Sequence, residues 1–219
     1  VGGVDDVLIK FNYIGNYGWH WAVDDIRIIE QPTDDIHLLS AWYVGENNEG
    51  IEYGRTPLDQ LDANYTVGSK ISNFGAAAQT LIDVDVDFVS FSTNLNQALL
   101  AVNDTTDIES SVVAVAATGT YDGTYIATSN EETAGPEFIN NTYLRSFAVT
   151  DNIYGTDGAG VYPVSVSELA SYGTTSSATA DGLVVANYYH IKQQSQISGY
   201  EILLGSNTVA GGEIYISII

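Results

Sequence analysis

Short runs in which apolar and polar residues alternate extend along most of the chain. The clearest run is residues 81–89, LIDVDVDFV, in which apolar side chains alternate with Asp83, Asp85 and Asp87. A period of two indicates a β-strand with one buried face and one solvated face. Clusters of Gly, Asn and Asp separate such runs, and the pattern predicts an all-β protein. The other expected strands are residues 7–14, 19–29, 36–44, 65–74, 111–117, 121–128, 142–150, 182–191, 200–204 and 213–219.

Two segments of this pattern allow more than one interpretation. The three aspartates of residues 81–89 would stand about 6.6–6.8 Å apart in a row on one face of a strand, where they could hold a cation. An EF-hand loop beginning at Asp83 would need glycine and glutamate, where this chain has Phe88 and Asn94. We therefore favour a solvated outer face that blocks edge-to-edge association. Residues 96–102, NQALLAV, fit a short helix and a strand equally well.

Two joints divide the chain. Residues 30–35, EQPTDD, form a polar break with a proline, which cannot donate to a strand ladder. Residues 155–181 are rich in Gly, Ser, Thr and Ala, a composition typical of a linker. The sequence between these joints has the size and strand pattern of an immunoglobulin-like β-sandwich. We assign residues 33–152 to that sandwich and residues 153–181 to a linker or loop.

The flanks of the expected sandwich are too short to be domains of their own. Residues 1–32 carry about two strand patterns, and a two-stranded hairpin is marginal in water. Residues 182–219 end inside a strand pattern, whose apolar edge would need a cover. We expect both flanks to be completed by neighbouring domains or by identical subunits, through strand complementation.

Composition narrows the classes of protein. Six Lys and Arg against 28 Asp and Glu give a formal net charge of -22, which excludes nucleic-acid binding. The chain has no cysteine, so it has neither disulfides nor thiolate metal sites. No apolar run reaches the roughly 20 residues that span a bilayer, so we expect no membrane insertion. His20, His37 and His190 stand far apart, and no nucleophile elbow or nucleotide-binding motif occurs, so we expect no enzyme activity.

Several short motifs carry a resemblance to a known class of protein. The run WAVDDI at residues 21–26 is similar to the closing strand of MAM-like or carbohydrate-binding jelly rolls, and residues 197–215 look like the start of another. The bend ISNFG at residues 71–75 is similar to that of adhesion-type immunoglobulin-like modules. Together they resemble large modular surface proteins that Bacteroidota export by type IX secretion. The resemblance implies an extracellular or cell-surface location and flanks, at residues 1–32 and 182–219, that belong to partial jelly-roll domains.

Two candidate sites fall in the first flank. In the resembling jelly rolls an aspartate at the position of Asp24 or Asp25 commonly ligates a structural Ca²⁺, and the alternative is a carboxylate that caps a loop. Tyr17 and Trp19 belong to an aromatic group, with Tyr13 and Trp21, that could stack against surface glycans. Aromatic residues are also ordinary strand residues, and we favour core or inter-domain packing for this group.

The sequence therefore predicts a non-catalytic structural or adhesive module of a large extracellular surface protein or filamentous appendage. One alternative is a carbohydrate-binding accessory module. Another is a non-catalytic region of a secreted hydrolase, whose catalytic motif would lie elsewhere in the polypeptide.

Overall fold

A computed structural model describes residues 10–12, 30–132, 136–156, 186–202, 211, 213 and 215–218. Its contacts divide the chain into Val1–Gln31 and Pro32–Ile219, and the description below concerns the second unit. The expected strands at residues 7–14 and 19–29 lie largely outside the described residues. So do all four candidate site residues, Tyr17, Trp19, Asp24 and Asp25, so the expected calcium and glycan sites stay predictions.

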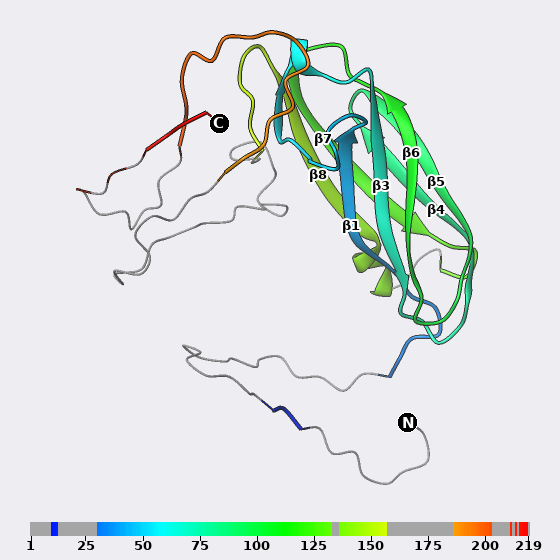
Figure 1. Cartoon of the computed structure of the whole chain (residues 1–219). Coiled ribbons are helices and arrows are strands. Elements are labelled where there is room, and N and C mark those ends of the chain that lie inside the picture. Colours follow the sequence, from blue (N-terminus) through cyan, green and yellow to red (C-terminus); the bar gives the residue numbers. More distant parts are fainter. Residues whose placement is uncertain are drawn as a thin grey trace. The chain divides into compact units, whose positions relative to one another are not determined.

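The described part of the chain is a β-sandwich of the immunoglobulin-like type (Figure 1). One sheet has the order β1-β3-β6 and the other the order β2-β8-β7-β4-β5. The chain crosses between the sheets after β1, β2, β3, β5 and β6. The strands are β1 (Ile36–Gly45), β2 (Arg55–Pro57), β3 (Asn64–Asn73), β4 (Gln79–Phe88), β5 (Phe91–Leu100), β6 (Thr105–Val113), β7 (Gly119–Thr128) and β8 (Thr142–Thr150), with 3-10 helices η1 (Leu58–Gln60) and η2 (Pro136–Asn141).

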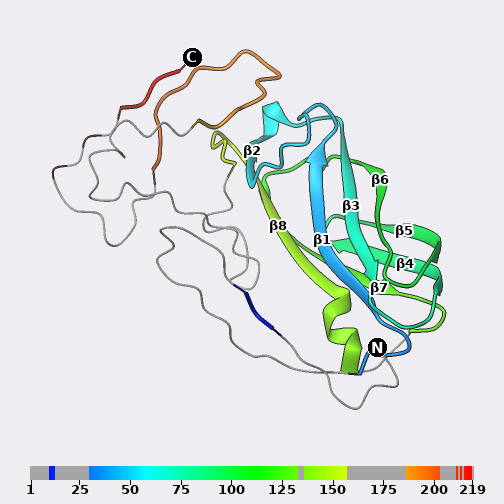
Figure 2. The ribbon, with the colours of Figure 1, turned by 60° about the horizontal axis from the view of Figure 1, so that its bottom comes forward.

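The alternation of apolar and polar residues identified most of these strands. Five expected runs became β1, β3, β4, β7 and β8 with small changes in their ends. Residues 96–100 belong to β5, so the strand interpretation of that segment is confirmed and the helix alternative is wrong. The strand expected at residues 111–117 instead covers Thr105–Val113. Its first half is polar and shows no alternating pattern, but it is hydrogen-bonded to β3. The three-residue β2, which pairs in parallel with β8 (Figure 2), is too short to carry a pattern.

The row of aspartates lies on the solvated face of β4, as expected. Asp85 and Asp87 are exposed, whereas Val84, Val86 and Phe88 are buried between the sheets. The proposed role in blocking an edge is wrong, because β4 pairs with both β5 and β7 and is an interior strand. Among the described residues, no three histidine, aspartate or glutamate side chains are placed to hold a metal ion together.

Stacked aromatic rings from both sheets fill the centre of the core. Tyr43 of β1 lies between Tyr65 of β3 and Phe147 of β8, with ring centroids 4.3 and 4.2 Å away. Phe88 of β4 stacks on Phe91 at 4.9 Å and lies directly opposite Gly123 of β7. A β-carbon on Gly123 would overlap the Phe88 ring, so this glycine makes room for the aromatic side chain.

The ISNFG bend is stabilised by the side chain of its asparagine. Asn73 is fully buried, and its Oδ1 accepts a hydrogen bond from the backbone N–H of Gly75 at 2.9 Å. Its Nδ2 donates to the carbonyls of Ala77 and Leu100, at 2.8 and 3.1 Å. A β-carbon on Gly75 would stand 2.7 Å from the carbonyl oxygen of Thr33. The motif therefore ties the β3–β4 turn to β5 and to the start of the domain.

The outer edge of β1 is occupied by carboxylates near both of its ends. Ile36, its first residue, donates its backbone N–H to Glu132 Oε2. Tyr43, near its last residue, donates to Glu52 Oε1 at 3.2 Å. Glu52 also accepts from Arg145 Nε of β8 at 3.2 Å and forms an ion pair with that guanidinium. The Arg145 side chain is 3% exposed and that of Glu52 is 23% exposed, so the pair joins the two sheets with its guanidinium buried and its carboxylate partly open to solvent.

The prediction of strands at residues 182–191, 200–204 and 213–219 is wrong where the structure describes them. Residues 186–202 have no regular secondary structure. Backbone groups of Tyr188, His190, Lys192 and Gln193 are bound instead by side chains of the sandwich.

Candidate functional site: a docking surface for residues 188–195

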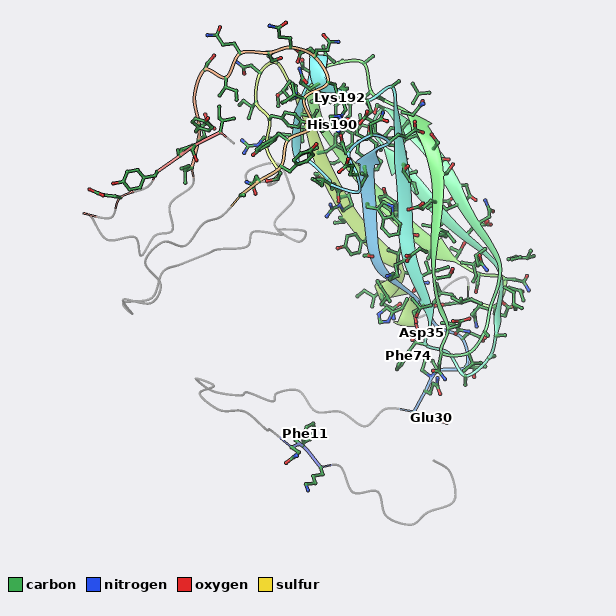
Figure 3. The ribbon with its side chains drawn as sticks, in the orientation of Figure 1. Phe11, Glu30, Asp35, Phe74, His190 and Lys192 are labelled. Atoms are coloured by element: carbon green, nitrogen blue, oxygen red, sulfur yellow. The ribbon has the colours of Figure 1, made fainter. Side chains whose placement is uncertain are left out.

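Residues 188–195 lie against one end of the sandwich, at the loops that follow β1 and flank β2 (Figure 3). We call this end, defined by Asn48, Tyr53, Gln60, Asp62 and Tyr154, the docking surface. Four of these residues have at most 5% of their surface exposed, and the fifth, Tyr154, is half-buried. Buried polar side chains cost stability unless they are hydrogen-bonded, and here the docked segment supplies partners.

Tyr53 and Tyr154 form the aromatic part of the docking surface, and Tyr189 of the docked segment packs against both. The Tyr189 ring stacks on Tyr53 with a centroid distance of 6.0 Å and meets Tyr154 edge-on at 5.2 Å. Tyr53 donates its hydroxyl hydrogen to the Tyr188 carbonyl at 3.0 Å and accepts from the His190 N–H at 3.1 Å. Burial raises the pKa of both Tyr53 and Tyr154. Both phenols therefore stay protonated donors at neutral pH.

Gln60, the last residue of η1, binds the docked backbone much as a neighbouring strand would. Its Oε1 accepts from the N–H of Lys192 at 2.9 Å. Its Nε2 donates to the carbonyl of Gln193 at 3.2 Å and to Ser195 Oγ at 2.9 Å. The side chain of Gln60 is thus fully used by a segment more than 130 positions away in sequence.

Lys192 of the docked segment places its ammonium group among buried polar side chains of the docking surface. Its Nζ lies 2.7 Å from Asp62 Oδ2 and donates to Asn48 Oδ1 at 2.6 Å. The Asp62 side chain is 2% exposed and that of Lys192 is 14% exposed. The other carboxylate oxygen of Asp62 accepts from Asn47 Nδ2 at 2.9 Å, which fixes the orientation of the carboxylate. A methyl group on Gly45 would overlap Asp62 Oδ2 and stand within 2.6 Å of Asn48 Nδ2.

A second feature, a hollow of about 370 Å³, lies on the outer face of the β1-β3-β6 sheet. Trp42 forms one wall; its indole covers Gly68, which has no β-carbon to displace it, and donates to Glu109 Oε1 at 3.1 Å. Glu46, Glu52 and Thr66 contribute further polar groups. An aromatic face beside carboxylates and a hydroxyl offers stacking and hydrogen-bond acceptors, which suit a neutral polyhydroxylated ligand.

Sequence reasoning missed both features. Asn48, Gln60 and Asp62 lie in polar stretches of ordinary composition. Their partners fall within residues 192–195, just after the run at residues 182–191 that the alternating pattern assigned to a strand. Lys192 did carry a signal, since Lys and Arg number only six in the chain. A lone cation in a largely uncharged stretch needs an acidic partner if it is buried.

The comparisons with known proteins give a distant likeness in structure. No protein-family model and no curated protein matches the chain. A crystal structure of the CARDB domain of a Pyrococcus furiosus protein in complex with di-metal ions is 10% identical, covering 59% of this chain and 99% of that one, with a TM-score of 0.42. A solution NMR structure of the same domain is 11% identical, covering 55% and 99%, with a TM-score of 0.41. These values leave the function to be argued from the chain itself.

Proposed function

We propose that this chain is a non-catalytic structural module of a larger extracellular surface protein, joined in a fixed orientation to the polypeptide that follows it. The observation that carries the proposal is the docking surface. Its buried polar groups are committed to the backbone of residues 188–195 and to Lys192. When buried side chains of a domain hydrogen-bond to the segment that follows it, they fix the direction in which that segment leaves the domain.

Composition supports a place outside the cell. The net charge of -22 keeps a long surface protein soluble through self-repulsion. The resemblance to type IX-secreted proteins of Bacteroidota points to the same location, and it adds an adhesive or filamentous role to the proposal. A structural Ca²⁺ held by Asp24 or Asp25 fits the same proposal and rests on that resemblance. In the described part of the chain, no helix is long and apolar enough to cross a membrane.

Antibodies raised against residues 32–156 test the location. We expect them to label intact cells of the source organism and to detect a denatured polypeptide several times heavier than 23.5 kDa. Labelling that appears only after permeabilisation would overturn the extracellular assignment. A surface polypeptide with a hydrolase motif in its neighbouring sequence would favour the accessory region of an enzyme over an appendage.

Hydrogen exchange of the amides of His190, Lys192 and Gln193 tests the fixed joint. We expect these amides to be protected in the full chain and to exchange about 10- to 100-fold faster in Gln60→Ala, because two or three hydrogen bonds of about 1 kcal/mol each are lost. Gln97→Ala is the matched control, since the Gln97 side chain donates to the nearby Leu99 carbonyl at 2.8 Å, away from the docking surface. Amides that exchange in the unmodified chain as fast as in an unstructured peptide would contradict the joint.

The hollow beside Trp42 favours one second candidate, a carbohydrate-binding module. A glycan array probed with the full chain tests it, and Trp42→Ala should weaken any saturable binding at least about tenfold, since stacking and burial of an aromatic ring contribute about 1.5 kcal/mol or more. Phe74→Ala, which removes a ring that is 44% exposed elsewhere on the domain, is the control. Binding lost in Trp19→Ala but kept in Trp42→Ala would assign the glycan site to the first flank, and an array without binding would remove this candidate.

A further inference from the structure

Lys192, Asn48 and Asp62 bring an amine, a carboxamide and a carboxylate together inside the docking surface. The Nζ of Lys192 lies 2.6 Å from the amide oxygen of Asn48 and 2.7 Å from Asp62 Oδ2. Asn48 is 1% exposed and Asp62 is 4% exposed, so water has little access to either group. The amine and the amide come from positions 144 residues apart, and the fold alone brings them into contact.

We propose that Lys192 and Asn48 become joined by an intramolecular isopeptide bond, with the carboxylate of Asp62 carrying the proton. This inference goes beyond the proposed function and does not rest on it. A structural module with no covalent bond at this position would leave the proposed function intact.

The reaction is an amide exchange that needs no cofactor and no oxidant. The Lys192 ammonium gives a proton to Asp62, and the resulting neutral amine attacks the side-chain carbonyl carbon of Asn48. The tetrahedral intermediate loses a proton from the former Nζ and collapses with cleavage of the bond from the carbonyl carbon to Nδ2. Nδ2 takes up the proton lost by the former Nζ and leaves as ammonia, which then accepts the proton held by Asp62 and departs as ammonium. One secondary amide forms, one primary amide is lost, and Asp62 returns to its carboxylate.

The positions of the proton carrier and the leaving group fit this sequence of steps. A single methyl group on Gly45 would meet both Asp62 Oδ2 and Asn48 Nδ2. The oxygen that takes the proton from lysine therefore lies beside the nitrogen that must receive one. The hydrogen bond from Asn47 to Asp62 Oδ1 leaves Oδ2 as the oxygen that faces the amine. Held groups of this kind gain a large effective concentration over the same groups free in water.

Aromatic and largely buried residues surround the Lys192–Asp62 pair. Tyr65 is 4% exposed, and after burial itself the negative charge of Asp62 is the next cause that raises its pKa. Tyr154 senses the same charge. Away from water, the preference for the charged pair over a neutral amine beside a protonated carboxyl is smaller than in solution. The neutral amine is the reactive form of Lys192. The exposed pair of Lys70 and Asp107, 3.5 Å apart with side chains 44% and 54% exposed, has none of these features.

The intact mass of the purified, folded full chain tests the bond. We expect it to fall below the sequence mass by one ammonia. Trypsin cleaves after Arg27, Arg55 and Arg145 but not after a modified Lys192. We therefore expect a branched peptide in which residues 28–55 are linked through Asn48 to a peptide that begins at residue 146 and continues past Lys192. Tandem mass spectrometry locates the link.

Two variants and one control complete the experiment. Lys192→Arg keeps the positive charge but has no amine of this kind, and Asp62→Asn removes the proton carrier; each is expected to show the full sequence mass with no branched peptide. Lys70→Arg should keep the mass deficit. A folded full chain with its unmodified mass and normal cleavage after Lys192 would overturn the proposal. So would an ammonia loss with normal cleavage there, because it would indicate a succinimide at an asparagine instead of a link to Lys192.

Discussion

Replacing Glu52 with alanine is expected to lower the free energy of unfolding of the sandwich by about 3–5 kcal/mol, because it removes one partner of a buried ion pair. Arg145 would keep its charge in a place where its side chain is only 3% exposed, without the carboxylate that faces it. The backbone N–H of Tyr43 would also lose its acceptor. Urea denaturation followed by far-ultraviolet circular dichroism measures the loss.

Two further variants separate the pair from its position. Glu52→Gln with Arg145→Met removes both charges at similar volume and should recover a large part of the loss, since desolvation opposes a buried pair. Asp107→Ala breaks the exposed pair with Lys70 and should cost at most about 1 kcal/mol. A loss in Glu52→Ala no larger than that in Asp107→Ala would show that water reaches Arg145 and that the pair does not hold the sheets together.

Replacing Gly123 with valine is expected to destabilise the domain by about 3 kcal/mol, at the upper end of the range for overpacked cores. Gly123 of β7 lies directly opposite Phe88 of β4, and any β-carbon there overlaps the ring. The ring has no free direction in which to move, since it also stacks on Phe91 and meets Tyr125 edge-on. A fall in melting temperature by calorimetry, with Thr124→Val on the opposite face of β7 as the control, measures the effect.

The clash itself can be isolated by shortening the aromatic partner. In the Phe88→Ala background, Gly123→Val should cost far less than in the unmodified chain, because the space above the strand is then open. A double-mutant cycle gives the difference as a coupling energy between the two residues. Equal costs in both backgrounds would mean that the backbone conformation at Gly123, rather than the ring, is what valine disturbs.

Strands with a clear alternating pattern could be predicted because their sequence reports one buried face. β4 is the best case: Val84, Val86 and Phe88 lie in the core and the aspartates face solvent. Whether a strand lies inside a sheet or at its edge depends on which strands pair with it, and the sequence of the strand alone does not specify these neighbours. For this reason the solvated face of β4 was predicted correctly and its position in the sheet was not. β2 and the polar half of β6 are held by neighbouring strands and carry little pattern of their own.

The docking surface was beyond the reach of sequence reasoning for a different reason. The run at residues 182–191 alternates well enough to indicate a strand, yet its described backbone groups at Tyr188 and His190 bind the Tyr53 side chain instead of a ladder. Gln60 binds the backbone of Lys192 just beyond that run. Side chains that hydrogen-bond a backbone in place of a neighbouring strand follow no regular spacing in the sequence, so no pattern predicts them. The contact between Lys192 and Asp62 depends on the folded path of the chain, so only the structure could bring those residues together.

The carboxylates along β1 also restrict how copies of this domain could assemble. A strand from another chain that added to the β1 edge would have to displace Glu132 from Ile36 and Glu52 from Tyr43. The second exchange would pull Glu52 away from Arg145, at the cost described above. At its other edge the same sheet ends in β6, where Val113 is 75% exposed. Because β6 is then the one edge of this sheet that can accept a strand, pairing through it would join two copies and stop, so a filament could not grow by edge-to-edge addition to this sheet.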